Sequence, residues 1–419
     1  MSDPSPASDT SVRALLRQGD FVLFWLSRWT AVLGVQIQSV ALGWHIYDIA
    51  RTDLGMDVKR AAFMVSLIGL VSFVPVLLLA LPAGEAADRY DRRRTLKFCY
   101  AGEIFTAVML AVAAFTGFAS IPLLLCAAFL FGTSRAFFAP ASTAMGPMLV
   151  PRELLPRAIA WNSLAWQTAS IAGPAIGGIL VAVSPGLSYA VAAGLYLVAV
   201  TTIWLIRSKT QPQVQPGSRW ELMKEGLAYV WNNKIVFGAI SLDLAAVILA
   251  GATAMLPVYA KDVLHVGPEG FGLLRAAPAV GAAAMAFYLA AVAIRRKAGI
   301  IMFVSVGLFA IGTIVFGLST SVWLSVGALA VLGAADMISV YIRQTLIQLA
   351  TPDHMRGRVA TVSSLFIGAS NELGEFRGGV VARFIGPVAA VVWGGVGALA
   401  VTVAWAKLFP ALRKADRLA

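Results

Sequence analysis

The chain is too apolar to be a water-soluble globular protein. Of its 419 residues 59% are hydrophobic and only 13% are charged, and the mean hydropathy is +0.80, whereas charged residues make up about a quarter of soluble domains. The formal net charge of +12 would suit a nucleic-acid-binding protein, but the basic residues gather in short loops beside apolar runs, as membrane orientation requires. Composition therefore predicts a polytopic membrane protein and excludes nucleic acid as a partner.

Apolar runs long enough to cross a bilayer, which takes about 20 residues, recur along the whole chain. Six fall in the first half, at 21–46, 61–82, 96–117, 121–147, 158–183 and 187–206. Six fall in the second half, at 235–260, 271–294, 298–318, 321–350, 359–383 and 387–409. The sequence therefore predicts an all-α membrane protein with twelve transmembrane helices in two six-helix bundles.

The predicted organisation has a tail at each end and a polar connector between the bundles. The segments are the tail 1–20, the first bundle 21–206, the connector 207–234, the second bundle 235–410 and the tail 411–419. The connector is rich in Pro, Gln and charge, and residues 220–231 predict an amphipathic surface helix. Basic residues favour the loops after even-numbered spans, so both termini are expected in the cytoplasm. No signal peptide is recognisable at the N-terminus.

Several predicted spans contain ionisable side chains, which cost about 2.5–3.5 kcal/mol each on insertion scales. Each such residue therefore requires a partner, a water-filled cavity or a function. They are, in chain order, Arg28, Glu103, Arg135, Asp243, Asp336, Arg343, Glu372, Glu375 and Arg377.

The densest charge lies between the second and third spans, where residues 84–94 read GEAADRYDRRR. Asp88 follows an apolar helix, where it can accept hydrogen bonds from the N-terminus of a neighbouring helix. The segment resembles a loop of the major facilitator superfamily, with the pattern G-x-x-x-D-R followed by G-R-R or G-R-K. The resemblance implies a gating loop, whereas the alternative is that its basic residues only set topology. The matching residues are Gly84, Asp88, Arg89, Arg92 and Arg93, and the departures are Ala86 and Asp91.

A second motif lies in the fifth predicted span, where Gly173, Pro174, Gly177 and Gly178 form a G-P-x-x-G-G run. Small residues four apart on one helix face allow another backbone to come close. The run resembles the motif associated with antiporting major facilitators, and this resemblance implies antiport. The alternative is ordinary helix packing, which such residues also favour.

An internal repeat supports the two-bundle interpretation. Shifting the sequence by 201 residues without a gap aligns loop proline and arginine residues and three glycines of the fifth span with identical residues in the second half. This duplication is typical of transporters in which one bundle rocks against the other. The aligned pairs include Gly132 with Gly333, Pro151 with Pro352, Arg157 with Arg358, Gly173 with Gly374, Gly177 with Gly378 and Gly178 with Gly379.

The family resemblance also implies a substrate cavity, because the first, fourth, seventh and tenth helices line it in major facilitators. Asp336 is the repeat counterpart of Arg135, so we predict that the two face each other as a substrate or gating pair. The alternative is a buried ion pair that only holds the bundles together. The expected cavity residues are Arg28, Arg135, Asp243, Asp336 and Arg343.

The eleventh span contains the segment NELGEF, which resembles the transmembrane secretion effector branch, relatives of bacterial siderophore (enterobactin) exporters. Glu372 and Glu375 are three residues apart and therefore share a helix face. A carboxylate pair in an apolar helix suits proton exchange, and Asp336 is the competing candidate. The alternative is a structural charge cluster in which Arg377 neutralises one of the carboxylates.

Together these features predict a secondary active transporter of the bacterial inner membrane, which exports small amphipathic molecules such as drugs or siderophores by proton antiport. The alternatives are an importer or lipid translocator of the same fold, or a non-transporting sensor. No HExxH, GxSxG or GxxxxGK[ST] motif suggests an enzyme. Three separated His and two Cys residues predict no metal and no cofactor. The expected partners are substrate, protons and lipid, and we expect a monomer.

Overall fold

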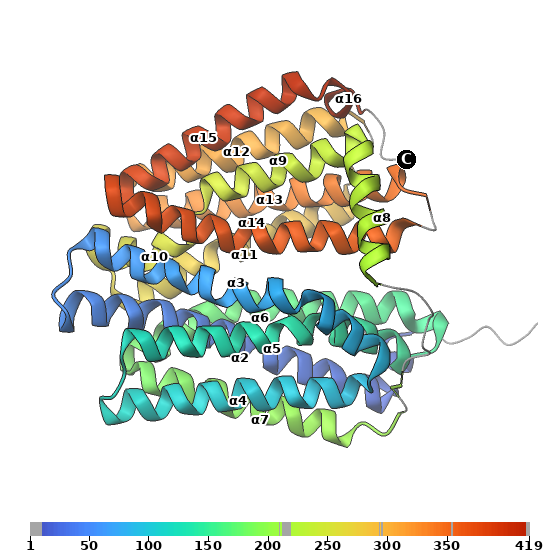
Figure 1. Cartoon of the computed structure of the whole chain (residues 1–419), viewed down its shortest axis with the longest axis horizontal. Helices are drawn as coiled ribbons and strands as arrows, with labels where there is room; N and C mark the ends of the chain where they lie inside the picture. Colours follow the sequence, from blue (N-terminus) through green and yellow to red (C-terminus); the bar gives the residue numbers. More distant parts are fainter. Residues whose placement is uncertain are drawn as a thin grey trace, which may run out of the picture.

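The computed structural model describes residues 11–208, 210–211, 219–292, 294, 296–352 and 355–415, and within those ranges all regular structure is helical. The predicted tails and the predicted connector therefore lie partly outside the described residues. Figure 1 shows two helix bundles, one built from the first half of the chain and one from the second.

A short helix, α1 (Val12–Leu16), precedes the first bundle. The bundle itself consists of α2 (Gly19–Asp48), α3 (Val58–Arg89), α4 (Arg92–Thr116), α5 (Ile121–Met145), α6 (Leu155–Val183) and α7 (Pro185–Leu205). Each of these long helices covers a predicted span. The chain leaves the bundle at the end where it entered, because the backbone N–H of Ser208 donates to the Asp20 carboxylate at 2.8 Å.

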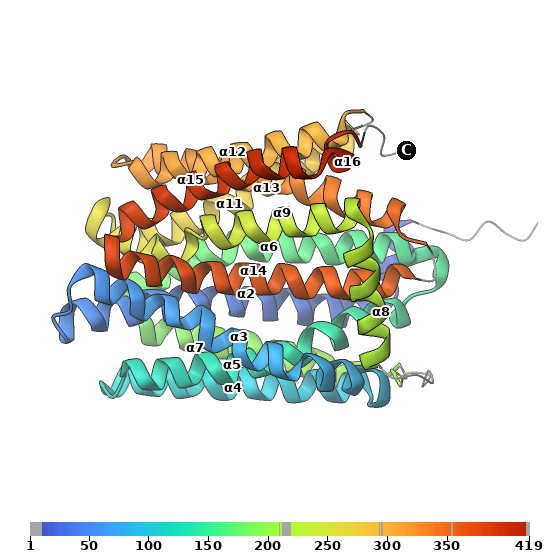
Figure 2. The same ribbon diagram turned by 45° about the horizontal axis from the view of Figure 1, so that its top comes forward.

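The connector contributes α8 (Arg219–Asn232), a helix that crosses one end of the molecule in Figures 1 and 2. The second bundle follows with α9 (Lys234–Ala250), the short α10 (Leu256–Val258), α11 (Gly267–Ala291), α12 (Ala298–Leu318), α13 (Val322–Ala350), α14 (Arg356–Ile385), α15 (Pro387–Leu408) and the short α16 (Pro410–Arg413). Five of its long helices match the spans predicted for this half to within a few residues, but the predicted span 235–260 is interrupted, because α9 ends at Ala250. The backbone of Gly251 lies so close to α14 that a Cβ there would be 2.5 Å from the Gly374 carbonyl oxygen. Between α9 and α10 lies a single 3₁₀ turn, Thr253–Met255.

Ten helical segments in the described ranges are long and apolar enough to cross a membrane. The two long helices outside that set are α2 and α14, each of 30 residues. Both carry polar side chains that line an internal cavity, among them Gln36 on α2 and Glu372 on α14. Their polarity therefore reflects what they face, and the twelve-helix arrangement is consistent with the prediction.

The two bundles are tied together at the end opposite α8. The Arg51 guanidinium pairs with the Asp262 carboxylate at 2.8 Å, and Tyr47 donates a hydrogen bond to the same carboxylate. Lys261 forms an ion pair with Asp48. These residues sit where α2 and the segment after α10 each end in a single π-helical turn, Ile49–Asp53 and Tyr259–Val263. We refer to Tyr47, Asp48, Arg51, Lys261 and Asp262 as the end lock.

The charged segment 84–94 is mostly helical, which corrects the prediction of a loop. Helix α3 continues to Arg89 and α4 begins at Arg92, so only two residues separate them. The Ala, Glu and Arg residues of the segment are good helix formers. The carboxylate of Asp91 accepts a hydrogen bond from the backbone N–H of Arg93 at 2.9 Å and so caps α4.

Candidate functional site: a central cavity between the bundles

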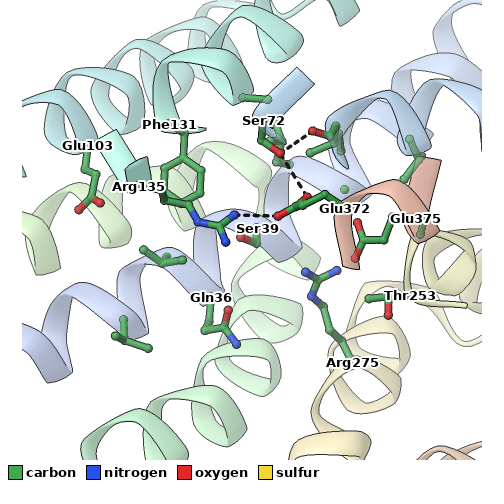
Figure 3. Close-up of a pocket in the computed structure, with 18 of the residues that line it drawn as sticks. Gln36, Ser39, Ser72, Glu103, Phe131, Arg135, Thr253, Arg275, Glu372 and Glu375 are labelled. Atoms are coloured by element: carbon green, nitrogen blue, oxygen red, sulfur yellow. Dashed lines mark hydrogen bonds and ion pairs between the residues drawn. The ribbon is translucent and has the colours of Figure 1, made fainter. Parts of the chain in front are cut away.

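A cavity of about 300 Å³ lies between the two bundles and mixes apolar walls with a few polar groups. Side chains from α2, α3, α4, α5 and α6 form one side, and side chains from the α9–α10 segment, α11 and α14 form the other. The polar residues on its wall, drawn in Figure 3, are Gln36, Ser39, Ser72, Glu103, Arg135, Thr253, Arg275, Glu372 and Glu375.

An ion pair crosses this cavity from one bundle to the other. The Arg135 guanidinium on α5 lies 3.1 Å from the Glu372 carboxylate on α14, and Ser72 of α3 donates to the same carboxylate at 3.5 Å. The Arg135 side chain is 45% exposed and that of Glu372 is 19% exposed, so both remain open to the cavity. The pair, visible in Figure 3, links the bundles through side chains that a proton or a bound molecule can reach.

The structure corrects the predicted partner of Arg135, which is Glu372 rather than Asp336. A second cavity of about 370 Å³, within the second bundle, is lined by Asp336 together with Asp243 and Arg343. The last two form a buried ion pair between α9 and α13. Repeat equivalence fixes the place of a residue within its own bundle, but it does not require that equivalent residues meet across the cavity.

Arg275 is a cavity residue that the sequence interpretation did not single out. It lies on α11, and in Figure 3 its guanidinium points towards the Glu372 and Glu375 carboxylates. Arg275, Glu375 and Thr253 line both cavities. Arg275 could have been found from the sequence, because it is an ionisable residue inside a predicted span, which is the criterion that selected the other charges. Glu103 was selected by that criterion, and its buried carboxylate also reaches the central cavity.

Four of the five residues predicted for the central cavity lie outside it, namely Arg28 and the three residues of the second cavity, Asp243, Asp336 and Arg343. Arg28 lines a separate cleft between α2, α5 and α6, so its predicted place among the residues of the central cavity is wrong. Arg377 donates a hydrogen bond to the Leu249 carbonyl of α9, so it neutralises neither Glu372 nor Glu375 by direct contact. Arg377 is two residues beyond Glu375, which turns its side chain to another face of α14.

The glycine run of α6 packs against two helices. Gly177 packs against α2, and a Cβ added to it would be 3.2 Å from the Ile37 Cα. Gly178 packs against α11 of the other bundle, and a Cβ added to it would be 2.8 Å from the Gly272 Cα and 2.7 Å from the Pro268 carbonyl oxygen. A Cβ at Gly177 would make a tight contact, whereas at Gly178 it would collide with backbone atoms, so only glycine fits there and the run joins the bundles through a close approach of their backbones.

The predicted gating residues lie at the α8 end of the first bundle. Arg89 pairs with Glu85 at 3.0 Å on α3, and Arg93 donates to the Ile206 carbonyl just beyond α7. Arg92 Nε donates to the Ala87 carbonyl at 3.3 Å. Gly84 is buried within α3, whereas the side chain of Asp88 lies outside the described residues. A gating role for this segment stays a prediction.

Two bundles of six long helices around a cavity crossed by an ion pair define a transporter of the major facilitator fold. Solved structures share this fold at low sequence identity. The POT family transporter PepTSo is 12% identical with a TM-score of 0.74 over 95% of this chain and 99% of that one. A D-xylose-proton symporter is 12% identical with a TM-score of 0.70 over 94% of this chain and 98% of that one.

The family itself follows from the sequence. The profile described as transmembrane secretion effector matches residues 10–419, so the chain belongs to this family of the major facilitator superfamily. Among its relatives is the multidrug efflux pump Tap of Mycobacterium tuberculosis, 27% identical over 81% of this chain and 83% of the relative. The enterobactin exporter EntS of Citrobacter koseri is 27% identical over 94% of this chain and 92% of the relative.

Proposed function

We propose that this protein is a proton-coupled exporter that moves small amphipathic molecules of drug or siderophore type across the bacterial inner membrane by alternating access. The names of the two relatives, a multidrug efflux pump and an enterobactin exporter, support export. The central cavity of about 300 Å³ is at the lower end of the size range of small-molecule pockets, about 300–1,000 Å³. In this proposal the protein is a monomer with both termini in the cytoplasm.

The observation that carries the proposal is the ion pair between Arg135 and Glu372, because its partners belong to different bundles. A proton on Glu372 removes the negative charge and weakens the attraction to Arg135. The two bundles then separate more easily, and the equilibrium between the two transport states shifts. Proton binding and substrate binding near this pair are thereby linked as reciprocal free energies.

Glu375 is the second carboxylate of the proposed coupling site. A Cβ added to Gly69 of α3 would lie 3.0 Å from the Glu372 carbonyl oxygen and 3.3 Å from the Glu375 Cβ, so α3 and α14 approach closely here. Because Glu375, Arg275 and Thr253 line both cavities, a proton can pass between Glu375 and water in either one. Asp336 in the second cavity remains the alternative coupling group.

Substrate-stimulated proton flux in proteoliposomes tests the proposal, with a panel of amphipathic compounds and an imposed pH gradient. Glu372→Gln should abolish uphill efflux and spare downhill exchange, since only the energy coupling is lost. Glu375→Gln and Asp336→Asn separate the roles of the other two carboxylates. Glu153→Gln, at an exposed carboxylate outside both cavities, is the matched control. If both α14 variants keep full proton-driven efflux, their carboxylates are structural.

A further inference from the structure

A cleft in the first bundle has no role in the function proposed so far. It has a volume of about 500 Å³ and lies between α2, α5 and α6. Its lining includes residues at the end of α5, the following turn and the start of α6, so it opens near the α8 end of the bundle. Trp166 lines both this cleft and the central cavity, so the cleft adjoins the route to the proposed substrate site.

Three polar groups on the cleft wall have buried atoms without a hydrogen-bond partner in the protein. They are Nε of Arg28 on α2, Oγ of Ser142 on α5 and Oδ1 of Asn162 on α6. Ser142 is only 3% exposed. Because almost all buried polar groups in proteins are hydrogen-bonded, three unpartnered ones on one wall point to a ligand or ordered water.

The charge on the wall selects the kind of ligand. Arg28 carries a positive charge inside a membrane helix, where a charge normally has a partner, yet no carboxylate of the described residues pairs with it. No Asp or Glu lines the cleft. The guanidinium and the Ser142 hydroxyl are donors. Oδ1 of Asn162 is an acceptor, and the amide presents two N–H groups in its place only when it is turned by 180°. Donors grouped around an unpaired arginine suit a carboxylate, sulfonate or phosphate.

Apolar side chains flank this polar wall. Ile159 is 56% exposed and Trp166 is 53% exposed, and both lie on α6 beside the cleft. A ligand with an acidic group and an adjoining apolar body would fit both surfaces, with the acid at Arg28 and the body along α6.

We propose that this cleft is a loading site that binds the acidic group of an anionic amphiphile before the molecule moves to the central cavity. This inference rests on the proposed export function and narrows its substrate class to acidic amphiphiles. The phosphate of an anionic lipid has the same chemistry as such an acidic group, so the experiment below distinguishes a lipid from a transported molecule. The site is defined as the Arg28 cleft: Arg28, Ser142, Asn162, Ile159 and Trp166.

Binding of a matched pair of fluorescent probes tests the Arg28 cleft. The anionic probe is 1-anilinonaphthalene-8-sulfonate, and the uncharged probe is N-phenyl-1-naphthylamine, which lacks only the sulfonate. Each is titrated into the full-length protein in phosphatidylcholine nanodiscs, with the signal of empty nanodiscs subtracted. Arg28→Gln should weaken the anionic probe at least about tenfold, as expected for loss of a charge-assisted hydrogen bond, and leave the uncharged probe within about twofold.

Three further variants make the test specific. Arg28→Lys should keep most of the affinity, and Ser142→Ala should lose a smaller part of it. Arg152→Gln removes an exposed positive charge at the same end of the bundle and outside the cleft, so it should leave anionic-probe affinity unchanged. Retained binding of the uncharged probe by Arg28→Gln shows that this variant is folded. Equal affinity of the wild type and Arg28→Gln for the anionic probe overturns the inference.

The source of the anion is settled by adding phosphatidylglycerol to the nanodiscs. If the added lipid weakens anionic-probe binding to the wild type and not to Arg28→Gln, a lipid headgroup occupies the cleft and the inference of a substrate loading site is overturned. If the added lipid does not change anionic-probe binding, the lipid headgroup does not occupy the cleft, and the result supports a transported acidic molecule as its ligand. The binding assay needs no transport, so failure of the export proposal in proteoliposomes is a separate result.

Discussion

Two helix pairs that join the bundles, α6 with α11 and α3 with α14, are built on the same glycine pattern but differ in charge. Gly69, Ser72 and Pro75 of α3 have the same spacing as Gly272, Arg275 and Pro278 of α11, at a shift of 203 residues, two more than the shift of 201 that relates the other repeat pairs. Pro75 packs near Gly132, and Pro278 near Gly333, its repeat counterpart. The repeat therefore extends to how the helices meet.

The difference lies on α14. On α6, Pro174 and Gly178 meet Gly272 through backbone atoms. On α14, Glu375 stands at the repeat position of Pro174, and Glu372 reaches across to Arg135. We call the first contact the neutral joint, because it closes through backbone atoms while Arg275 of α11 points towards the carboxylates of α14. We call the second contact, which carries Glu372 and Glu375, the charged joint. The comparison teaches that the two halves have similar joints and that sequence divergence has placed ionisable groups in one of them.

The neutral joint should be the more sensitive to size. Gly178→Leu places a side chain where even a Cβ would lie 2.8 Å from the Gly272 Cα. Because overpacking costs about 1–3 kcal/mol or more, we expect transport to fall roughly tenfold to 100-fold. Hydrogen exchange should also speed up at the end lock, since the bundles can no longer close there. Gly194→Leu on α7, where nothing lies within 4 Å, is the control, and an equal result for both variants would contradict a role for the close contact.

The charged joint should be the more sensitive to the sign of charge. Arg135→Glu and Glu372→Arg each place two like charges face to face, and we expect uphill efflux to fall about tenfold, corresponding to about 1.4 kcal/mol. The double variant restores opposite charges and should recover part of the efflux. A double variant no better than the worse single one would show that the two residues act independently. Combining Arg135→Glu with Asp336→Arg, which lies in the other cavity, should give no recovery.

The end lock should have the smallest effect of the three. Asp262→Asn weakens the ion pair with Arg51 and the hydrogen bond from Tyr47. In that ion pair the Arg51 side chain is 28% exposed and the Asp262 side chain is 19% exposed. Because partly exposed ion pairs contribute little, about 1 kcal/mol or less, we expect roughly a threefold to fivefold change in transport rate. Hydrogen exchange of residues 49–53 should increase in parallel. Unchanged exchange there would show that backbone packing alone closes this end.

The structure is consistent with the predicted spans, apart from the break in the seventh at Gly251, because hydrophobic length is a strong local signal. The charges inside the spans pointed to cavities but not to the right one, since Arg135, Glu372 and Glu375 reach the central cavity whereas four of the five residues predicted there line other cavities. The choice of partners was not predictable, because it depends on how two bundles are placed across a cavity. Arg135 therefore forms an ion pair with Glu372 rather than with its repeat counterpart Asp336, and Arg28 lines a separate cleft. The charged segment after the second span became helix because its residues form helices readily and Asp91 caps the next helix.

The helix of the connector has a mechanical consequence. Glu225 of α8 pairs with Arg358, and Tyr229 donates to the Ala350 carbonyl, both in the second bundle. A Cβ on Gly226 would lie 2.9 Å from the Arg358 carbonyl oxygen, so the helix is seated against α14. We therefore expect α8 to move together with the second bundle. Energy transfer between a fluorophore on α8 and one on α4 would then measure how far the two bundles move relative to each other.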